Sequence, residues 1–493
     1  MRSIVLLLAA STLTTTTLSA ASLAQRIGHI IDSSPIIDQA FFGIEILDLE
    51  TGKTLYSKNA NHLLIPASNT KLFTTALALT RLGPDYHYIT RVLASTAPDA
   101  DGCLHGDLIL KGAGDPSLSG RVIPYYKDAP PGEPLRALEE LADQVIAHGV
   151  RRIGGDIIGD DTAYIWEPYP PGWSEEDTVW DYGAPVSALS IDDNFIQLSL
   201  RPGDLEGDPP HLTLDPPLPY YWIDNRAVTS AAETKIDVDR GPGSPQLLLS
   251  GTISHPVTEA VAINDPARFA ACALADALTR RGVVIDGRPR AHHRLPTDGP
   301  AAPNPPITLA SRTSPPLAQL LQVTDKVSEN LYAELFLREV GHGQRREGLD
   351  AMKAFLADAA IDAGDTNFED GSGLSRLTLV TPHAIAQLLA WMYRSPNRDT
   401  WISLLPIGGY DGSLAHRFRA QAIARVIHAK TGSLSHVNSL SGYVLQPEHH
   451  AVVFSIAVNN TISGNSSGSV NHSSGPPTEV RQFIDKIALA ITK

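Results

Sequence analysis

The spacing of apolar residues along the chain predicts a series of helices. Positions three and four residues apart share one face of a helix, so apolar residues at that spacing form a stripe that packs on a core. The last pattern of this kind includes Val480, Phe483 and Ile487. Helices are predicted at residues 23–31, 68–82, 135–148, 265–281, 317–321, 328–340, 348–360, 382–393 and 480–491.

Strand-like patterns gather at the two ends of the chain. Residues 41–48 and 53–57 form a predicted hairpin near the start. Three further runs, at residues 425–431, 440–445 and 451–458, lie near the end. We expect these five strands to form one antiparallel sheet, with the first and last helices packed on it and a helical subdomain beside it. The predicted fold class is therefore α+β.

The middle of the chain has a different sequence pattern. Short strand-like runs, such as residues 108–111 and 153–158, alternate there with Pro- and Gly-rich segments. A Pro- and Ala-rich stretch at residues 295–316 marks a boundary. We therefore expect β-rich domains inserted into a split domain. The predicted division is 22–94 with 306–493 for the split domain, 95–187 with 252–305 for inserted domain II, and 188–251 for inserted β-rich domain III.

Composition and charge exclude several classes of partner. The 493 residues are 43% hydrophobic and 19% charged, as in a globular protein, and the formal net charge is −15. Nucleic acids and anionic membrane surfaces both require a basic face, so neither is expected as a partner. Residues 1–21 have the pattern of an export signal, and no later run reaches the roughly 18 apolar residues of a membrane span. We expect an exported, periplasmic or extracytoplasmic soluble protein without a stable membrane anchor.

The only cysteines are Cys103 and Cys272. In an exported protein they could be bonded, or they could be two unpaired thiols, and the sequence favours neither. No grouping of His and Cys has the spacing of a metal site, so we expect no metal and no organic cofactor.

The first chemical motif is Ser68-Asn69-Thr70-Lys71, at the start of a helix. Residues three apart share a helical face, so the Lys71 amine lies within reach of the Ser68 hydroxyl. The apolar residues that follow carry the amine into the interior, where desolvation lowers its pKa and makes it a usable base. A serine beside such a base is the opening requirement of covalent acyl transfer. For a lone motif of this kind, the alternative is a core helix that happens to begin with serine.

Two further motifs follow in order. Ser328-Glu329-Asn330 opens an apolar helix, and Lys430-Thr431-Gly432 ends the strand-like residues 425–429. Gly432 allows a substrate backbone to approach the strand closely. An S-x-N triplet alone carries little information, but K-T-G occurs once in the chain. The three motifs together are far more specific than any one of them.

This motif set resembles the penicillin-interacting serine enzymes. The 256 residues between the first two motifs are too many for a compact β-lactamase, and the chain looks like a class C, low-molecular-mass penicillin-binding protein of the D-alanyl-D-alanine carboxypeptidase/endopeptidase family. That family implies a serine DD-peptidase/β-lactamase-like domain with insertions. Further segments carry the resemblance: GDPSL at 114–118, GGDI at 154–157, YGAPVSAL at 182–189 and DGSGLSR at 370–376.

The resemblance implies a role for each motif residue. Ser68 attacks the D-Ala-D-Ala carbonyl while Lys71 takes its proton. Ser328 and Lys430 relay a proton to the departing D-alanine. Asn330 holds Lys71 and the substrate amide. A second set of residues is implied in binding: Lys430 and Thr431 attract the terminal carboxylate, and the backbone N–H groups of Ser68 and Ser433 form the oxyanion hole beside Gly432.

Members of the family also use an acidic residue of the insertion to bind the amine end of the stem peptide. Asp177 is the candidate here, with Asp181 as an alternative; either could instead be a solvated loop carboxylate. Residues 370–376 are interpreted as a tight Gly-rich turn more readily than as a contact to substrate.

The predicted function is hydrolysis of peptidoglycan stem peptides ending in D-Ala-D-Ala by an exported serine-type carboxypeptidase or DD-endopeptidase. β-Lactam antibiotics are expected as covalent inhibitors. One alternative is a β-lactamase, which the long insertion and the absence of an E-x-x-L-N segment disfavour. The other is a non-catalytic protein that binds the cell wall or senses penicillin, which the intact motif residues disfavour.

Overall fold

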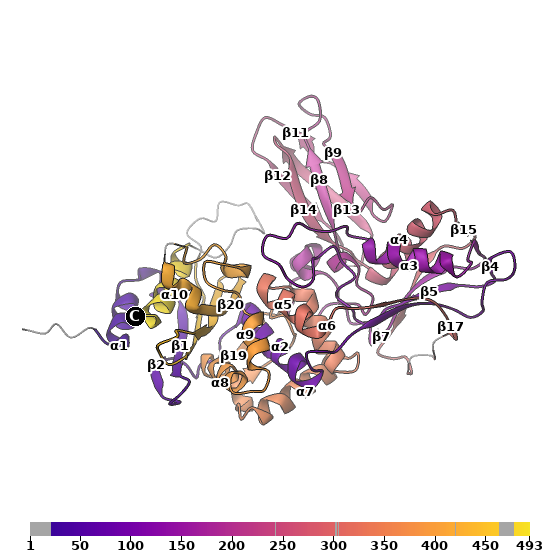
Figure 1. Cartoon of the computed structure of the whole chain (residues 1–493). Coiled ribbons are helices and arrows are strands. Elements are labelled where there is room, and N and C mark those ends of the chain that lie inside the picture. Colours follow the sequence, from indigo (N-terminus) through magenta and orange to yellow (C-terminus); the bar gives the residue numbers. More distant parts are fainter. Residues whose placement is uncertain (1–20, 242, 301–302, 304, 420, 463–477) are drawn as a thin grey trace, which may run out of the picture.

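Figure 1 shows the computed structural model of the protein. It describes residues 21–493 apart from 242, 301–302, 304, 420 and 463–477. The predicted export signal lies outside the described residues but for residue 21. The helices are α1 (Leu23–Asp32), α2 (Thr70–Arg81), α3 (Arg136–Ala147), α4 (Pro266–Arg280), α5 (Leu317–Val327), α6 (Asn330–Val340), α7 (Arg345–Asp358), α8 (Pro382–Tyr393), α9 (Arg398–Leu404) and α10 (Thr478–Ile491). Helix α9 was not predicted, and α5 extends beyond the predicted residues.

The two ends of the chain form one sheet, as predicted. All four pairings in the strand order β2-β1-β22-β21-β20 are antiparallel. The early strand β1 pairs along its whole length with the late strand β22, from Phe41 opposite Asn459 to Asp48 opposite Val452. These strands are β1 (Phe41–Asp48), β2 (Thr54–Lys58), β20 (Ile427–Leu434), β21 (Val437–Val444) and β22 (Val452–Asn459).

Both faces of this sheet are covered, which explains why β21 is buried at every position. Successive side chains of a strand point to opposite faces. Val453 accordingly joins the core that contains α8, whereas Phe454 and Ile456 join the core that contains α10. Helix α10 also packs on α1, so the first and last helices lie together on the outer face.

The helical part of the fold surrounds α2, which is buried along most of its length. Helices α5, α6 and α7 pack against it and share one hydrophobic core with it, including Phe73, Leu335 and Phe355. This core positions the start of α2 between the sheet edge strand β20 and the start of α6. The predicted α+β class, with a helical subdomain beside an antiparallel sheet, is confirmed.

Residues 89–313 form four further sheets around a common core. The predicted strand 153–158 is in fact two strands in two sheets, β6 and β7, because Gly154 and Gly155 separate them. The predicted boundary segment 295–316 contains a full strand, β17, which pairs with β3. The strands are β3 (Ile89–Ala94), β4 (Cys103–Leu104), β5 (Leu108–Lys111), β6 (Arg152–Ile153), β7 (Ile157–Ile165), β8 (Phe195–Arg201), β9 (His211–Asp215), β10 (Trp222–Asn225), β11 (Val228–Thr229), β12 (Lys235–Asp239), β13 (Gln246–Ile253), β14 (Val257–Ala262), β15 (Val284–Ile285), β16 (Pro289–Arg294) and β17 (Ile307–Thr313).

Strands β8 to β14 stand out from the rest of the molecule in Figure 1. Their apolar residues nevertheless share a core with α3, α4 and β5. The division of the chain into domains at residues 95, 188, 252 and 306 stays a prediction.

Two smaller points concern the chain as a whole. Cys103 and Cys272 are both free thiols. Within the part of the chain that the structure describes, none of the helices has the length and apolar character needed to cross a bilayer.

Candidate active site

Ser68 lies in a short 3-10 turn, η2 (Ala67–Asn69), directly before α2 rather than in its first α-helical turn. Ala67 has a positive φ of 49°, an unusual backbone conformation for a residue with a side chain. Contacts from the sheet hold the turn: Ser439 Oγ donates to Pro66 O at 2.7 Å, and Asn69 Nδ2 donates to Lys430 O at 3.1 Å. The sheet edge therefore fixes the position of Ser68.

Lys71 lies fully buried in the first turn of α2 with three polar neighbours. Its Nζ is 2.9 Å from Ser68 Oγ, 2.5 Å from Asn330 Oδ1 and 2.7 Å from Ser372 O. The amide and carbonyl oxygens only accept hydrogen bonds. A neutral amine with two hydrogens therefore donates to both and keeps its lone pair for the Ser68 hydroxyl hydrogen, which is the arrangement of a general base.

Burial is the main cause that lowers the pKa of Lys71, to about 8. The carboxylates of Asp370, Glu329, Glu334 and Asp325 act in the opposite direction and raise this pKa. The sequence predicted a lysine made basic by desolvation. The surrounding carboxylates were not predicted, and they keep the pKa from falling further.

Ser328 and Lys430 form the second pair of a serine and a lysine at the site. Ser328 follows α5 in the left-handed conformation, with φ 66° and ψ 40°, which turns the chain between α5 and α6. Lys430 Nζ lies 2.7 Å from Ser328 Oγ and 2.9 Å from Thr431 O. Lys430 is fully buried on β20, and burial together with the charge of Lys71 lowers its pKa well below the ordinary value.

Asn330 is the first residue of α6 and links three segments. Its Oδ1 accepts from Lys71, and its Nδ2 donates to Tyr182 O at 2.7 Å. Tyr182 belongs to the short turn η4 (Asp181–Gly183), which comes from the middle of the chain. The three motifs predicted from the sequence thus lie at one site, and residues 181–183 join them.

Glu329 and Arg121 form an ion pair that was not predicted from the sequence. The Glu329 side chain accepts from Leu331 N at the start of α6, and its other oxygen pairs with Arg121. Arg121 also pairs with Asp193, whose second oxygen accepts from Tyr332. The middle of the chain is therefore anchored to the S-x-N motif through its central residue.

Gly432 lies against the nucleophile's own backbone. A Cβ at this position would lie 2.2 Å from Ser439 Oγ, 2.7 Å from Pro66 O and 3.1 Å from Ser68 N. The sequence predicted that Gly432 allows a substrate backbone to approach the strand closely. In the structure, the backbone of residues 66–68 already lies this close to Gly432. The adjacent Thr431 Oγ1 donates to Ser413 Oγ at 2.8 Å, and Ser433 pairs with Asn438 in the β20–β21 ladder.

The Gly-rich turn at residues 370–376 supplies the carbonyl that binds Lys71. Asp370 holds the turn with its two oxygens, which accept from five donors: Ser372 Oγ, Gly373 N, Ser375 N, Thr378 Oγ1 and Trp173 Nε1. Glu334 adds a second support by accepting from the backbone N–H groups of Gly371 and Ser372, each at 2.8 Å. The sequence marked this segment as a turn but carried no signal that its backbone contacts the base.

The predicted substrate residue Asp177 lies half-buried in the short helix η3 (Glu176–Val179). Tyr182 Oη donates to its Oδ1 at 3.2 Å, whereas its buried Oδ2 has no hydrogen-bond partner among the described residues. The alternative, Asp181, is exposed, and one of its oxygens accepts from Tyr182 N at 2.8 Å. Asp177 therefore has one carboxylate oxygen without a partner, but that oxygen is buried, whereas Asp181 is exposed.

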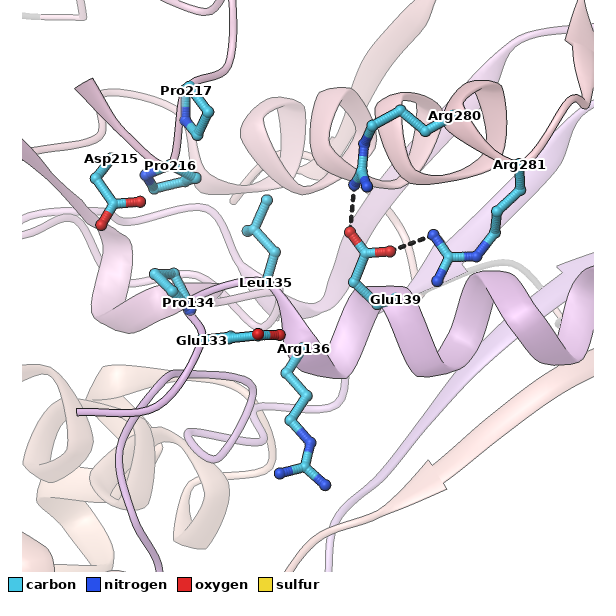
Figure 2. Close-up of a pocket in the computed structure, with 10 residues that line it drawn as sticks. All are labelled: Glu133, Pro134, Leu135, Arg136, Glu139, Asp215, Pro216, Pro217, Arg280 and Arg281. Carbon is cyan, nitrogen blue, oxygen red and sulfur yellow. Dashed lines mark hydrogen bonds and ion pairs between the residues drawn. The ribbon is translucent and has the colours of Figure 1, made fainter. Parts of the chain in front are cut away.

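Other grouped polar residues lie outside this site. Asp99, Cys103 and His105 have ligand atoms within 4.8 Å of one another, but His105 Nε2 already contacts Asp99 Oδ2 at 2.7 Å. A separate pocket between α3, α4 and residues 215–217 contains Arg280 and Arg281 (Figure 2). Both arginines point at Glu139, which pairs with them. Arg280 also pairs with Asp276 and Arg281 with Asp143, so three carboxylates face the two guanidinium groups.

The fold and the site together define a class of protein. The structure is similar to penicillin binding protein 4 (DacB) of Haemophilus influenzae, with a TM-score of 0.80 at 23% identity over 95% of this chain and 99% of that one. The same protein in complex with a β-lactam gives a TM-score of 0.76 at 22% identity, over the same shares of the two chains. The architecture is thus that of a penicillin-binding protein, which confirms the predicted serine-peptidase/β-lactamase-like fold.

Sequence comparisons identify the family. The model of the D-Ala-D-Ala carboxypeptidase 3 (S13) family matches residues 23–474. A D-alanyl-D-alanine carboxypeptidase of an Actinomadura species is 35% identical over 451 residues, which are 87% of this chain and 79% of that protein. The D-alanyl-D-alanine carboxypeptidase DacB of H. influenzae is 25% identical over 420 residues, 82% of each chain. The chain belongs to the D-Ala-D-Ala carboxypeptidase 3 (S13) family, a peptidase family of cell-wall hydrolases that bind penicillin, as the sequence predicted.

Proposed function

We propose that the protein is an exported serine-type D-Ala-D-Ala carboxypeptidase and DD-endopeptidase, which hydrolyses peptidoglycan stem peptides through an acyl-enzyme on Ser68. The observation that carries the proposal is the environment of Lys71 Nζ. It lies 2.9 Å from the Ser68 hydroxyl while two pure acceptors take its own hydrogens. This is the geometry of a base that activates a nucleophile.

In the acylation step, Ser68 Oγ attacks the carbonyl carbon of the D-Ala-D-Ala bond and its proton passes to Lys71. The backbone N–H groups of Ser68 and Ser433 stabilise the resulting oxyanion. The tetrahedral intermediate collapses, the peptide C–N bond breaks, and Ser328, in contact with Lys430 at 2.7 Å, gives its proton to the leaving amine. In deacylation a water molecule gives a proton to Ser328 and attacks the ester, and Lys71 returns its proton to Ser68 Oγ as the shortened peptide leaves.

The two ends of the substrate have separate binding groups. Lys430, with the hydroxyls of Thr431 and Ser413 beside it, attracts the terminal carboxylate. We assign the amine end of the stem peptide to the carboxylate of Asp177, whose unpartnered Oδ2 is buried and must become accessible before it can bind the amine. A substrate that carries a carboxylate at one end and an amine at the other, with a D-alanyl bond between them, satisfies all of these groups.

Covalent labelling tests the proposal directly. A fluorescent penicillin is expected to label the wild-type protein and not the Ser68→Ala variant, with the exposed Ser57→Ala on β2 as a control that keeps the label. Mass spectrometry of products from a pentapeptide and from cross-linked muropeptides then reports carboxypeptidase and endopeptidase activity. Unchanged labelling of Ser68→Ala, or penicillin turnover without any D-alanine release, would refute the assignment.

A further inference from the structure

Asp325 is a buried carboxyl group beside the catalytic lysines with no part in the mechanism above. It lies in the last turn of α5, three residues before Ser328, and is fully buried. Helix α5 packs against α2, which carries Lys71. A charged carboxylate in such a position is costly unless donors or cations surround it.

The contacts of Asp325 indicate a neutral acid. Thr75 Oγ1 lies 3.1 Å from Asp325 Oδ2 and 2.7 Å from Lys71 O, which can only accept. A threonine hydroxyl has one hydrogen to donate. When that hydrogen goes to the shorter contact with Lys71 O, the contact with Asp325 requires the carboxyl group to be the donor. Asp325 Oδ1 has no hydrogen-bond partner among the described residues.

The other carboxyl groups whose charges act on Lys71 already have strong partners. Glu329 pairs with Arg121, and Glu334 pairs with Arg338 at 3.0 Å. Asp370 accepts five hydrogen bonds. Within the described part of the chain, Asp325 is therefore the one member of this group that combines complete burial with a single hydroxyl contact.

Three cations face Asp325 without forming an ion pair with it. Lys71 faces it from α2 and Lys430 from β20, and both act on its pKa through their charges. Lys326, on its own helix, is held elsewhere by Asp411 at 2.6 Å and Leu405 O at 2.8 Å. Burial raises the pKa of Asp325 to about 7, and the lysine charges oppose that rise. Asp325 thus changes charge in the same pH range in which the site must work.

We propose that Asp325 is a positioning residue that acts through Lys71 and Lys430 by setting their proton affinity. It is neutral at rest and becomes a carboxylate as the pH rises, and the new charge favours the protonated lysines. The inference rests on the proposed function, because the two lysines act there as base and as carboxylate-binding cation.

The test is the pH profile of Ser68 acylation by a fluorescent penicillin in wild type and in the isosteric variant Asp325→Asn. Without the carboxylate, both lysines lose their protons at lower pH. Both limbs of the profile are expected to move to lower pH by about one unit or more, the usual size of an ion-pair effect on a pKa. A profile that is lower in height but unshifted would overturn the proposal, because it indicates a structural role alone.

Two further variants make the result specific. Once Asp325 is a carboxylate it can only accept, so the Thr75 hydroxyl, its one hydrogen-bond partner among the described residues, then donates to it and favours the charged form. Thr75→Val removes that hydrogen bond, keeps Asp325 neutral to higher pH, and is expected to shift the profile in the same direction by a smaller amount. The matched control is Thr324→Val. Thr324 is buried next to Asp325, and among the described residues its hydroxyl bonds only Leu320 O of its own helix. It is expected to leave the profile unshifted.

A measurement without catalysis separates this inference from the proposed function. The folded pKa of Asp325 is raised above the unfolded value of 3.8, so its stabilising contribution is complete at low pH and is lost as the pH rises to about 7. Relative to Asp325→Asn, wild type is expected to lose thermal stability between about pH 4 and pH 7. An unchanged difference contradicts the inference whether or not Ser68 is acylated, whereas absent acylation of wild type contradicts only the proposed function.

Discussion

At the scale of single residues, the proposed chemistry of the site depends on the positions of a few hydrogen atoms. Lys71 and Lys430 are both completely buried, and each has a serine hydroxyl within 3 Å of its Nζ. Burial lowers the pKa of both amines. In the proposed mechanism, the protonation state of each lysine decides whether the serine beside it acts as a nucleophile or as an acid. The pKa of these lysines is therefore the first property to test.

Acylation of Ser68 is expected to depend on the pKa of Lys71, which burial lowers to about 8. The base acts when it is neutral, so on the acidic limb of the profile the rate should rise as the pH increases toward 8. A stopped-flow series of β-lactam acylation rates between pH 5 and pH 10 measures this limb. A rate that already reaches its plateau at pH 6 would contradict the role of Lys71 as the base.

Gly432→Ala is expected to lower the acylation rate. The added Cβ would lie 3.1 Å from Ser68 N and 2.7 Å from Pro66 O, so the turn that carries Ser68 must move. Displacing one oxyanion donor costs roughly 10²–10³-fold in rate in other serine enzymes. Penicillin acylation kinetics measure the loss. Gly28→Ala, on α1 with no atom within 4 Å of the new Cβ, is the control expected to retain wild-type rates.

The residue types of the site could be predicted from the sequence, and several of its contacts could not. Ser68, Lys71, Ser328, Asn330 and Lys430 stand in motifs whose order is informative. The carbonyl of Ser372 has no residue signature, because any residue could supply a backbone oxygen. Arg121 and Asp325 had no signal either, since their significance depends on which side chains the fold places beside them.

At the scale of elements, the site is assembled where a 3-10 turn, two helix starts and a sheet edge meet. Helix α5 ends and α6 begins around Ser328, whose left-handed backbone redirects the chain between them. Arg121, from the segment after β5, reaches Glu329 at this junction. The junction of α5 and α6, which carries the second motif, is thus anchored by a residue that belongs to neither helix.

Arg121→Gln is expected to destabilise the junction. It leaves Glu329 and Asp193, whose side chains are 13% and 4% exposed, without their common cation. Loss of a hydrogen-bond partner for a largely buried charge costs roughly 1–3 kcal/mol in unfolding free energy. Denaturant titration of wild type, Arg121→Gln, Glu329→Gln and the double variant measures the coupling. Additive losses in the double variant would show that the pair does not interact.

Strand and helix predictions succeeded where the pattern was long and failed where it was short. The eight-residue β1 and the twelve-residue α8 were predicted at their observed ends. The short helix α9 and the strand β17, which lies in a Pro-rich stretch, were missed. A seven-residue helix with three apolar residues, or a strand beside prolines, does not differ enough from a loop in sequence. Tertiary pairing with β3 decides the structure of β17.

At the scale of the whole molecule, the two ends of the chain support each other. Helices α1 and α10 pack together over the outer face of the sheet that both ends build. Five large apolar residues of α10 are buried there: Val480, Phe483, Ile484, Ile487 and Ile491. The stability of this part of the molecule therefore depends on the last residues of the chain.

Removal of residues 478–493 is expected to prevent stable folding. Burial of each large apolar side chain contributes about 1.5–3 kcal/mol, and five of them together match the usual net stability of a domain, about 5–15 kcal/mol. Soluble yield and thermal unfolding of the truncated protein measure the effect. Removal of the exposed Lys493 alone is the control. A truncated protein that melts at the wild-type temperature would contradict the proposed importance of α10.

The pairing of β1 with β22 also has a consequence for the order of events in the cell. A ribosome makes the nucleophile at position 68 early, but the strand that completes the first sheet ends at Asn459. The relay amine at position 430 also belongs to the final seventh of the polypeptide. A nascent chain that lacks these residues therefore contains Ser68 without the lysine and the strand that complete the proposed site, so the site cannot assemble before residue 459 has been synthesised.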